Sequence, residues 1–122
     1  MYKNESTENY LETILMLSKT LPVVRSVEVA ETLGFTKPSV SVAMKNLREK
    51  DYVTVTKEGY IYLTDAGRKI AETIYERHEL LTSWLTALGV DKNTAEEDAC
   101  KIEHVISAES FQAIKEHIAK HT

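Results

Sequence analysis

One stretch limits the possible folds of this 122-residue chain more than any other, the run from Ser26 to Leu63. It begins with two short amphipathic segments, 26–33 and 37–50, joined by a turn that contains Gly34, which is typical of a helix-turn-helix. Two alternating segments within 52–63 then flank a second turn, and this pattern predicts a β-hairpin. A hairpin directly after the second helix is a wing. The stretch therefore predicts a winged helix-turn-helix, a fold that binds DNA.

Residue types at the segment ends support these helices. We expect Ser26 to cap the first helix of the pair, Gly34 to end it, and Thr36 to cap the second helix, with Pro38 in its first turn.

Four more amphipathic helices are predicted outside this stretch. They lie at 6–19, at 65–88 after a Thr64 cap, at 94–106, and from Ser107 to the C-terminus. Asn93 and Glu96 form a possible capping box for the helix at 94–106. The predicted fold class is mainly α, with a winged helix-turn-helix in residues 1–70 and a helical metal-binding and dimerisation lobe in residues 71–122.

The composition, 43% hydrophobic and 28% charged, is that of an ordinary globular protein. The N-terminal residues are polar, so we expect no signal peptide, and no apolar run approaches the roughly 18 residues of a membrane helix. The single cysteine excludes an internal disulfide and fits a reducing compartment. We therefore expect a cytoplasmic protein with no membrane partner.

The net charge of −4 is unevenly distributed along the chain. Residues 19–69 carry +3, whereas residues 70–122 carry −5. A basic centre followed by an acidic half fits a DNA-binding part attached to a cation-binding part. Chance variation between solvated faces is the alternative.

The second helix of the pair is expected to enter the major groove of DNA. Its start and its outward face carry the candidate DNA-binding residues Thr36, Lys37, Pro38, Ser39, Ser41, Val42 and Lys45. Arg25, before the helix pair, and Lys57, in the wing, are expected to contact neighbouring phosphates. The alternative is an ordinary solvated helix face, and only the combination of helices and wing favours DNA.

Cys100, Glu103 and His104 follow one another at i, i+3 and i+4 in the C-terminal half. If one helix carries all three, the thiolate, carboxylate and imidazole lie on the same side and suit a transition metal. A chance cluster on a solvated helix is the alternative. A thiol enzyme using Cys100 and His104 is a poorer interpretation, because nothing supplies an oxyanion hole or an orienting third group.

Other donors lie elsewhere in the chain. His78 in the long helix is placed to face the cluster, and the first helix offers three side chains that would complete a coordination sphere, Glu8, Asn9 or Glu12. His117 and His121, at i and i+4, would suit zinc, or simply belong to a solvated tail.

These motifs resemble those of the metal-dependent repressors of the diphtheria toxin repressor and manganese transport regulator type. That family combines an acidic N-terminal helix motif, a winged helix-turn-helix, a long helix with a basic-His-x-Leu motif, and a Glu-His pair. The matching segments here are Glu8–Glu12, Ser26–Leu63, Arg77–Leu81 and Cys100–Ser107. The resemblance covers nearly the whole chain and indicates a short form, without an SH3-like domain.

The resemblance implies a homodimer that binds palindromic operators when two metal sites per subunit are loaded. The implied metal ligands are Asn9, Glu12, His78, Cys100, Glu103 and His104, with Glu96 as a possible second-site ligand. It also implies a regulator and not an enzyme, with no small organic substrate. A constitutive winged-helix protein without metal control is the competing function.

Three positions depart from the family patterns. Asn9 stands where manganese-type members usually carry Asp, and Cys100 stands where they carry Glu. Iron-type members share the cysteine but carry Met at position 9, and Thr82 replaces an acidic residue frequent in both branches. Thiolate with imidazole favours Fe²⁺, Co²⁺ or Zn²⁺ over Mn²⁺. We therefore expect Fe²⁺ with Mn²⁺ a close second, and Zn²⁺ or Co²⁺ binding in vitro.

Apolar residues in the C-terminal half exceed what one small lobe needs to bury. We expect six of them to form a dimer interface, namely Trp84, Leu85, Leu88, Phe111, Ile114 and Ile118.

Overall fold

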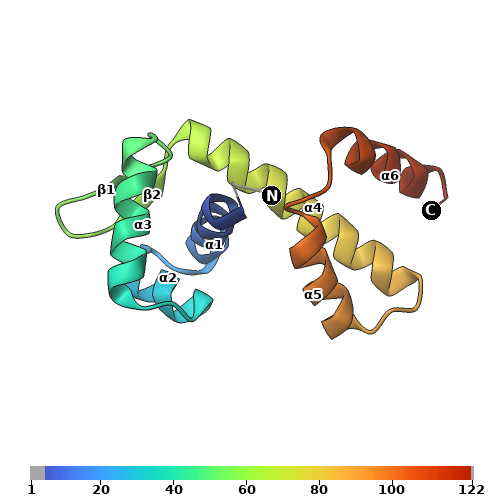
Figure 1. Cartoon of the computed structure of the whole chain (residues 1–122), viewed down its shortest axis with the longest axis horizontal. Coiled ribbons are helices and arrows are strands. Elements are labelled where there is room, and N and C mark those ends of the chain that lie inside the picture. The colour runs from blue at the N-terminus through green and yellow to red at the C-terminus, as the bar shows by residue number, and fades with distance from the viewer. Residues whose placement is uncertain (1–4, 122) are drawn as a thin grey trace. The chain divides into compact units, whose positions relative to one another are not determined.

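The computed structural model describes residues 5–121 of the chain. The expectation of no signal peptide rests partly on residues 1–4, which lie outside this range. In chain order the elements are α1 (Glu5–Thr20), α2 (Ser26–Leu33), α3 (Lys37–Glu49), β1 (Val53–Val55), β2 (Ile61–Leu63), α4 (Asp65–Ala87), α5 (Lys92–Ile102) and α6 (Ala108–Lys120) (Figure 1). The predicted mainly α fold with one small hairpin is confirmed.

The chain divides into two compact units, and the boundary, between Glu72 and Thr73, falls inside α4. The boundary predicted from the sequence, between residues 70 and 71, lies close to it. Among the described residues, no helix combines the length and the apolar character that crossing a membrane requires.

The first unit is a winged helix-turn-helix. Its three helices and its hairpin share one apolar core, because each element contributes the side chains of a single face. The fully or almost fully buried members of this core include Leu11, Ile14, Val29, Val40 and Ile61. The amide of Ile61 also donates to the Val24 carbonyl at 2.8 Å, which ties the wing to the segment before α2.

The local signals around the helix pair are mostly confirmed. Gly34 adopts φ 72° and its amide donates to Ala30 O, so it ends α2 as expected. The Thr36 hydroxyl accepts the Ser39 amide at 3.3 Å and caps α3. The Ser26 cap is wrong: Arg25 holds the N-cap position, and its amide donates to the Glu28 carboxylate at 2.8 Å. A carboxylate three residues into the helix replaces the hydroxyl that we expected.

The wing is the predicted antiparallel hairpin, with Val53 opposite Leu63 and Val55 opposite Ile61. It returns directly onto the start of α4, where a Cβ atom at Gly67 would lie 2.0 Å from the backbone oxygen of Tyr52. Only glycine allows this close approach, which fixes how the hairpin packs on the helix.

The second unit contains the later part of α4 together with α5 and α6. Its core is formed by Leu81, Ala99 and Phe111, and Trp84 and Ile102 pack around them. Phe111 is only 7% exposed. Most of the Phe111 surface is therefore covered within the unit, and its role in a dimer interface stays a prediction.

Two features of α5 differ from the sequence prediction. Asp91, and not Asn93, is the N-cap, because its carboxylate accepts the Asn93 amide at 3.1 Å. The helix also ends at Ile102 and not at Ile106. Glu103 is consequently the C-cap of α5, still with helical dihedral angles, and its carboxylate lies near Cys100, whereas His104 lies in the turn that follows.

Candidate metal centre and DNA-binding surface

The turn after α5 holds two ionisable side chains away from solvent. Glu103 is 0% and His104 is 1% exposed. Glu103 is the C-cap of α5, and its amide donates to Ala99 O at 2.9 Å. A carboxylate at this depth is costly unless positive charge or hydrogen-bond donors surround it.

Arg77 of α4 fixes this turn. Its Nη1 atom donates to Glu103 O at 3.1 Å and to Ile106 O at 3.0 Å, and its guanidinium lies 5.6 Å from the centre of the Phe111 ring. The guanidinium therefore satisfies two backbone carbonyls that the end of α5 leaves without helical partners. Arg77 belongs to a motif that we noted in the sequence, but its role was missed; its position beside His78 was the available signal.

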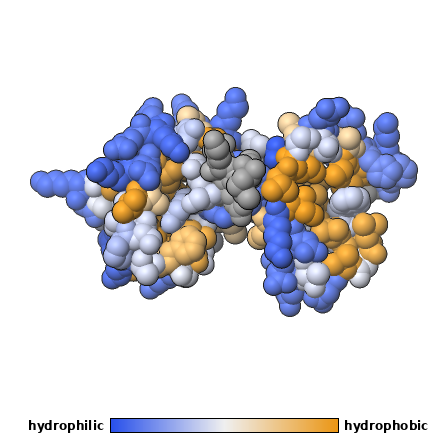
Figure 2. Space-filling view, in the orientation of Figure 1, coloured by the Kyte–Doolittle hydropathy of each residue, from blue (hydrophilic) through white to orange (hydrophobic). Residues whose placement is uncertain are grey.

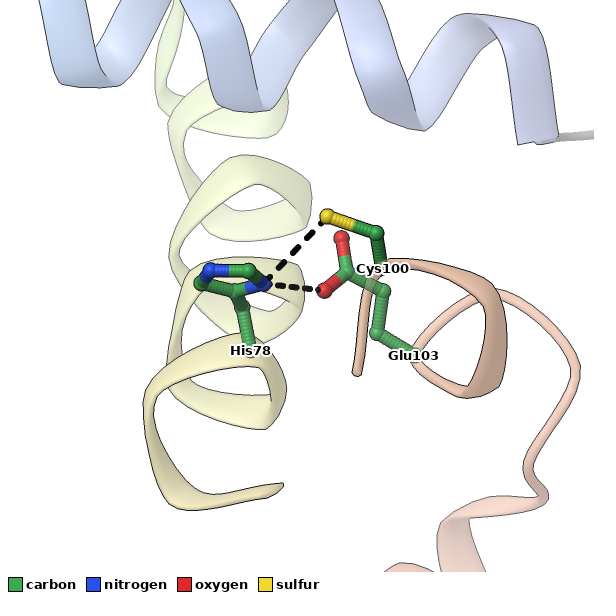
Figure 3. A group of neighbouring side chains, drawn as sticks. All are labelled: His78, Cys100 and Glu103. Carbon is green, nitrogen blue, oxygen red and sulfur yellow. Dashed lines mark hydrogen bonds and ion pairs between the residues drawn. The ribbon is translucent and has the colours of Figure 1, made fainter. Parts of the chain in front are cut away.

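His78, Cys100 and Glu103 bring three donor atoms together (Figure 3). His78 comes from α4, and its Nδ1 atom lies 2.9 Å from Glu103 Oε1 and 3.7 Å from Cys100 Sγ. The three donor atoms all lie within 4.8 Å of one another. Ligands at normal metal–nitrogen, metal–oxygen and metal–sulfur bond lengths are separated by about 3–4 Å. The donor set therefore fits a divalent transition metal with little rearrangement.

The second carboxylate oxygen of Glu103 points to another histidine. Oε2 lies 3.4 Å from His104 Nε2, within ion-pair distance. Among the described residues, no donor reaches this buried oxygen with hydrogen-bond geometry. A buried acceptor without a hydrogen-bond donor favours a nearby cation. Glu103 thus presents one oxygen to His78 and the other to His104.

The surroundings of His78 favour its protonated form. The Cys100 sulfur and the Glu103 carboxylate raise the pKa of His78 to about 10, although partial burial acts in the opposite direction. At neutral pH the metal-free protein therefore holds a proton at Nδ1, where it balances the negative charge of its neighbours. This proton occupies the place that a cation would take.

The remaining predicted ligands lie elsewhere. Glu96 is partly exposed on α5 and does not belong to the group of donor atoms around His78. Asn9 and Glu12 lie on α1, in the other unit, and their role as ligands stays a prediction.

The predicted DNA-binding residues of α3 all lie on the exposed side of the helix, while Val40, Met44 and Leu47 are buried on its other side. Val42 is 61% exposed, an unusual position for an apolar side chain without a partner to cover it. Such a side chain in a recognition helix is suited to contact a thymine methyl group.

Arg25 and Lys57 are exposed as well. The Arg25 guanidinium lies 5.1 Å from the centre of the Tyr60 ring, which holds it beside the wing. Tyr60 was missed by the sequence interpretation, because its pairing with Arg25 depends on how the hairpin folds back.

Two family models match this chain along almost its whole length. Residues 4–60 match the iron-dependent repressor N-terminal DNA-binding domain, and residues 64–122 match the iron-dependent repressor metal-binding and dimerisation domain. The chain belongs to the family of metal-dependent repressors. It is a DNA-binding transcriptional repressor of metal homeostasis and not an enzyme.

Individual relatives agree with this assignment. The repressor is 30% identical over 120 residues to the transcriptional regulator MntR of Escherichia coli, a match that covers 98% of this chain and 77% of the relative. Among solved structures, it is similar to a manganese-dependent transcriptional repressor in complex with manganese (TM-score 0.84, 26% identity) and to ScaR with bound Zn²⁺ (TM-score 0.77, 25% identity). Each structural match covers 92% of this chain, which spans about half of those chains, 52% and 53%.

Metal binding to the repressor should release protons. Because the pKa of His78 is about 10, its imidazole must lose a proton before Nδ1 can act as a ligand at pH 7. We expect calorimetry with Mn²⁺ in buffers of different ionisation enthalpy to show release of at least one proton per ion. The affinity should rise at least about tenfold per pH unit between pH 6 and 8, since each proton released contributes a factor of about ten. An affinity independent of pH, with no proton released, would contradict the proposed role of His78.

Arg77→Ala should weaken metal binding without unfolding the protein. The variant removes both hydrogen bonds to the turn that presents Glu103, and losses of this kind typically reduce metal affinity by about 10–100-fold. Arg68→Ala is the matched control, because Arg68 lies on the same helix and pairs with exposed Glu72. Equal affinity in both variants, measured by calorimetry with Mn²⁺, would show that Arg77 does not position the site.

Proposed function

We propose that this repressor senses Fe²⁺, with Mn²⁺ as a close second effector, through a centre that contains His78, Cys100, Glu103 and His104. The observation that supports this proposal is the shared position of three different donors, with His78 Nδ1 2.9 Å from a carboxylate oxygen and 3.7 Å from a thiol sulfur. Sulfur and imidazole ligands favour Fe²⁺, Co²⁺ and Zn²⁺, whereas Mn²⁺ prefers oxygen. Cys100 is thus the residue on which the proposed preference depends, and Zn²⁺ and Co²⁺ should bind in vitro.

Asn9 and Glu12 are the proposed additional ligands. The described donors around His78 supply three ligands, and Fe²⁺ and Mn²⁺ commonly accept more than three. The proposal of Asn9 and Glu12 is supported by their match to the family motif in the first helix. His104 is a further candidate, because the second oxygen of Glu103 lies near its Nε2 atom. Glu96 lies outside the donor group and is a weaker proposal.

We propose that metal binding switches the repressor by changing the charge beside Glu103 and by using a turn that is already held in place. A bound cation replaces the His78 proton as the positive charge beside the buried carboxylate. Arg77 holds the turn backbone in place, so Glu103 and His104 are presented with little loss of conformational freedom. We propose that loading shifts the population toward conformers whose recognition helices match successive major grooves, about 34–36 Å apart on a palindromic operator.

The proposed homodimer interface is an apolar groove in the second unit. The groove has a volume of about 760 Å³ and lies between side chains of α4 and α6. Its lining includes three residues of the predicted interface, Trp84, Leu88 and Ile118. Leu88 is 65% exposed, and Figure 2 shows apolar surface on this unit. A second copy is the proposed occupant, because the matching family model is a dimerisation domain. Leu85 and Ile114, both partly buried, are proposed to lie at its margin.

The cytoplasm is the proposed place of action. Operator DNA is reached there, and the lone Cys100 stays reduced and able to bind metal.

Cys100→Glu should change the metal preference. The wild-type protein should bind Fe²⁺ more tightly than Mn²⁺ in anaerobic calorimetry, and the substitution should reduce the ratio of the two affinities at least about tenfold, since it exchanges sulfur for oxygen. Cys100 is exposed, so the variant should fold normally. Tighter binding of Mn²⁺ by the wild type, or an unchanged ratio in the variant, would contradict the iron preference.

Operator binding should require metal and the buried pair. We expect DNA selected from a random pool with Mn²⁺-loaded protein to be released by a chelator. Glu103→Gln and His104→Ala should each weaken metal-dependent binding at least about tenfold, because they remove ligand atoms or charge from the centre. Glu97→Ala, an exposed carboxylate on α5, is the control. Circular dichroism checks that each variant is folded. Operator binding that persists in chelator and in both variants would instead favour a constitutive winged-helix protein.

A further inference from the structure

Two histidines at the end of α6 are not used by the regulatory centre. His117 and His121 are both exposed and stand four residues apart, so their side chains lie on one face of the helix. The centres of their imidazole rings are 4.2 Å apart, and the ring planes are inclined by 32°. An i, i+4 pair of histidines is a recurrent zinc-binding arrangement.

A hydrogen bond prepares one of these rings for metal binding. His121 Nδ1 lies 2.8 Å from the backbone oxygen of His117. Because a carbonyl oxygen only accepts, the proton of the neutral ring must be on Nδ1, and Nε2 keeps its lone pair. Metal-binding histidines are usually held in this way, with the other ring nitrogen donating to a carbonyl or a carboxylate.

The pair lines an apolar groove that also contains two carboxylates. His117 and His121 line the same groove as Glu76 and Glu79 of α4, and this is the groove proposed above as the homodimer interface. Lys115 forms an ion pair with Glu76, whereas Glu79 forms no ion pair with another described residue. In the described part of the chain, no third His, Cys, Asp or Glu donor forms a compact group with these two histidines. The site would therefore be a two-histidine chelate, completed by water or by movement of the Glu79 side chain.

We propose that His117 and His121 form a second transition-metal site, separate from the regulatory centre and specific for ions that prefer imidazole. Zn²⁺, Ni²⁺ and Cu²⁺ suit two nitrogen ligands, whereas Mn²⁺ binds such a pair weakly. The two sites thus differ in chemistry: one offers sulfur and a buried carboxylate, and the other offers two nitrogen atoms in the groove proposed above as the homodimer interface. This inference does not depend on which metal the regulatory centre senses.

The test is a Zn²⁺ titration of the untagged full chain by calorimetry. We expect the wild type to bind at least one more Zn²⁺ per subunit than His117→Ala/His121→Ala, and each single variant to lose most of that binding. The histidines are exposed, so the double variant should keep its circular dichroism spectrum and its Mn²⁺ affinity. Glu116→Ala/Lys120→Ala, which alters neighbouring exposed residues of α6, is the matched control.

A spectroscopic measurement distinguishes this site from the regulatory one. Trp84 is the only tryptophan of the chain and lines the same groove, so Ni²⁺ bound at the pair should quench its fluorescence. The quenching should persist in Cys100→Ser and disappear in the double histidine variant. Equal Zn²⁺ stoichiometry in the wild type and the double variant would overturn the proposal, as would binding that the α6 control removes equally. Neither outcome bears on operator binding or on the regulatory centre.

Discussion

The buried carboxylate of Glu103 is the constraint on which the rest of this structure depends. It is fully inaccessible to solvent, with one oxygen 2.9 Å from His78 Nδ1 and the other 3.4 Å from His104 Nε2. Such a group costs several kcal/mol unless a cation or strong donors compensate it, on the order of the whole stability margin of a small domain. Arg77 fixes the backbone of the turn but leaves the carboxylate itself to the histidines. The second unit is therefore organised to receive positive charge.

This arrangement leaves room for chemical variation at one position, Cys100. Glu103 and the two histidines would serve either ion, since oxygen and imidazole ligands bind both. Cys100 is exposed at the edge of the group, 3.7 Å from the same Nδ1 atom. A ligand at the edge can change without disturbing the buried atoms. The preference for one metal is thus separable from the capacity to bind a metal at all.

Much of the fold could be predicted because its signals are local. Gly34 and Thr36 determine helix ends through their own backbone and hydroxyl groups, and the alternation of the wing follows from a half-buried hairpin. The failures involve competition between neighbours or distant contacts. Asp91 and Arg25 are the N-caps at positions where we expected Asn93 and Ser26. Helix α5 ends four residues earlier than predicted, at a turn that accepts hydrogen bonds from Arg77 of α4. The residue types of the centre were therefore predictable, whereas their division between an exposed thiol and a buried pair was not.

The central claim is that sulfur, imidazole and carboxylate bind one ion together. The most direct test is the absorption spectrum of the Co²⁺-loaded protein under anaerobic conditions. We predict a sulfur-to-cobalt charge-transfer band in the near ultraviolet that is lost in Cys100→Ser and retained in Glu97→Ala. A wild-type spectrum without that band, at full Co²⁺ occupancy, would show that Cys100 does not coordinate the ion and would contradict this account.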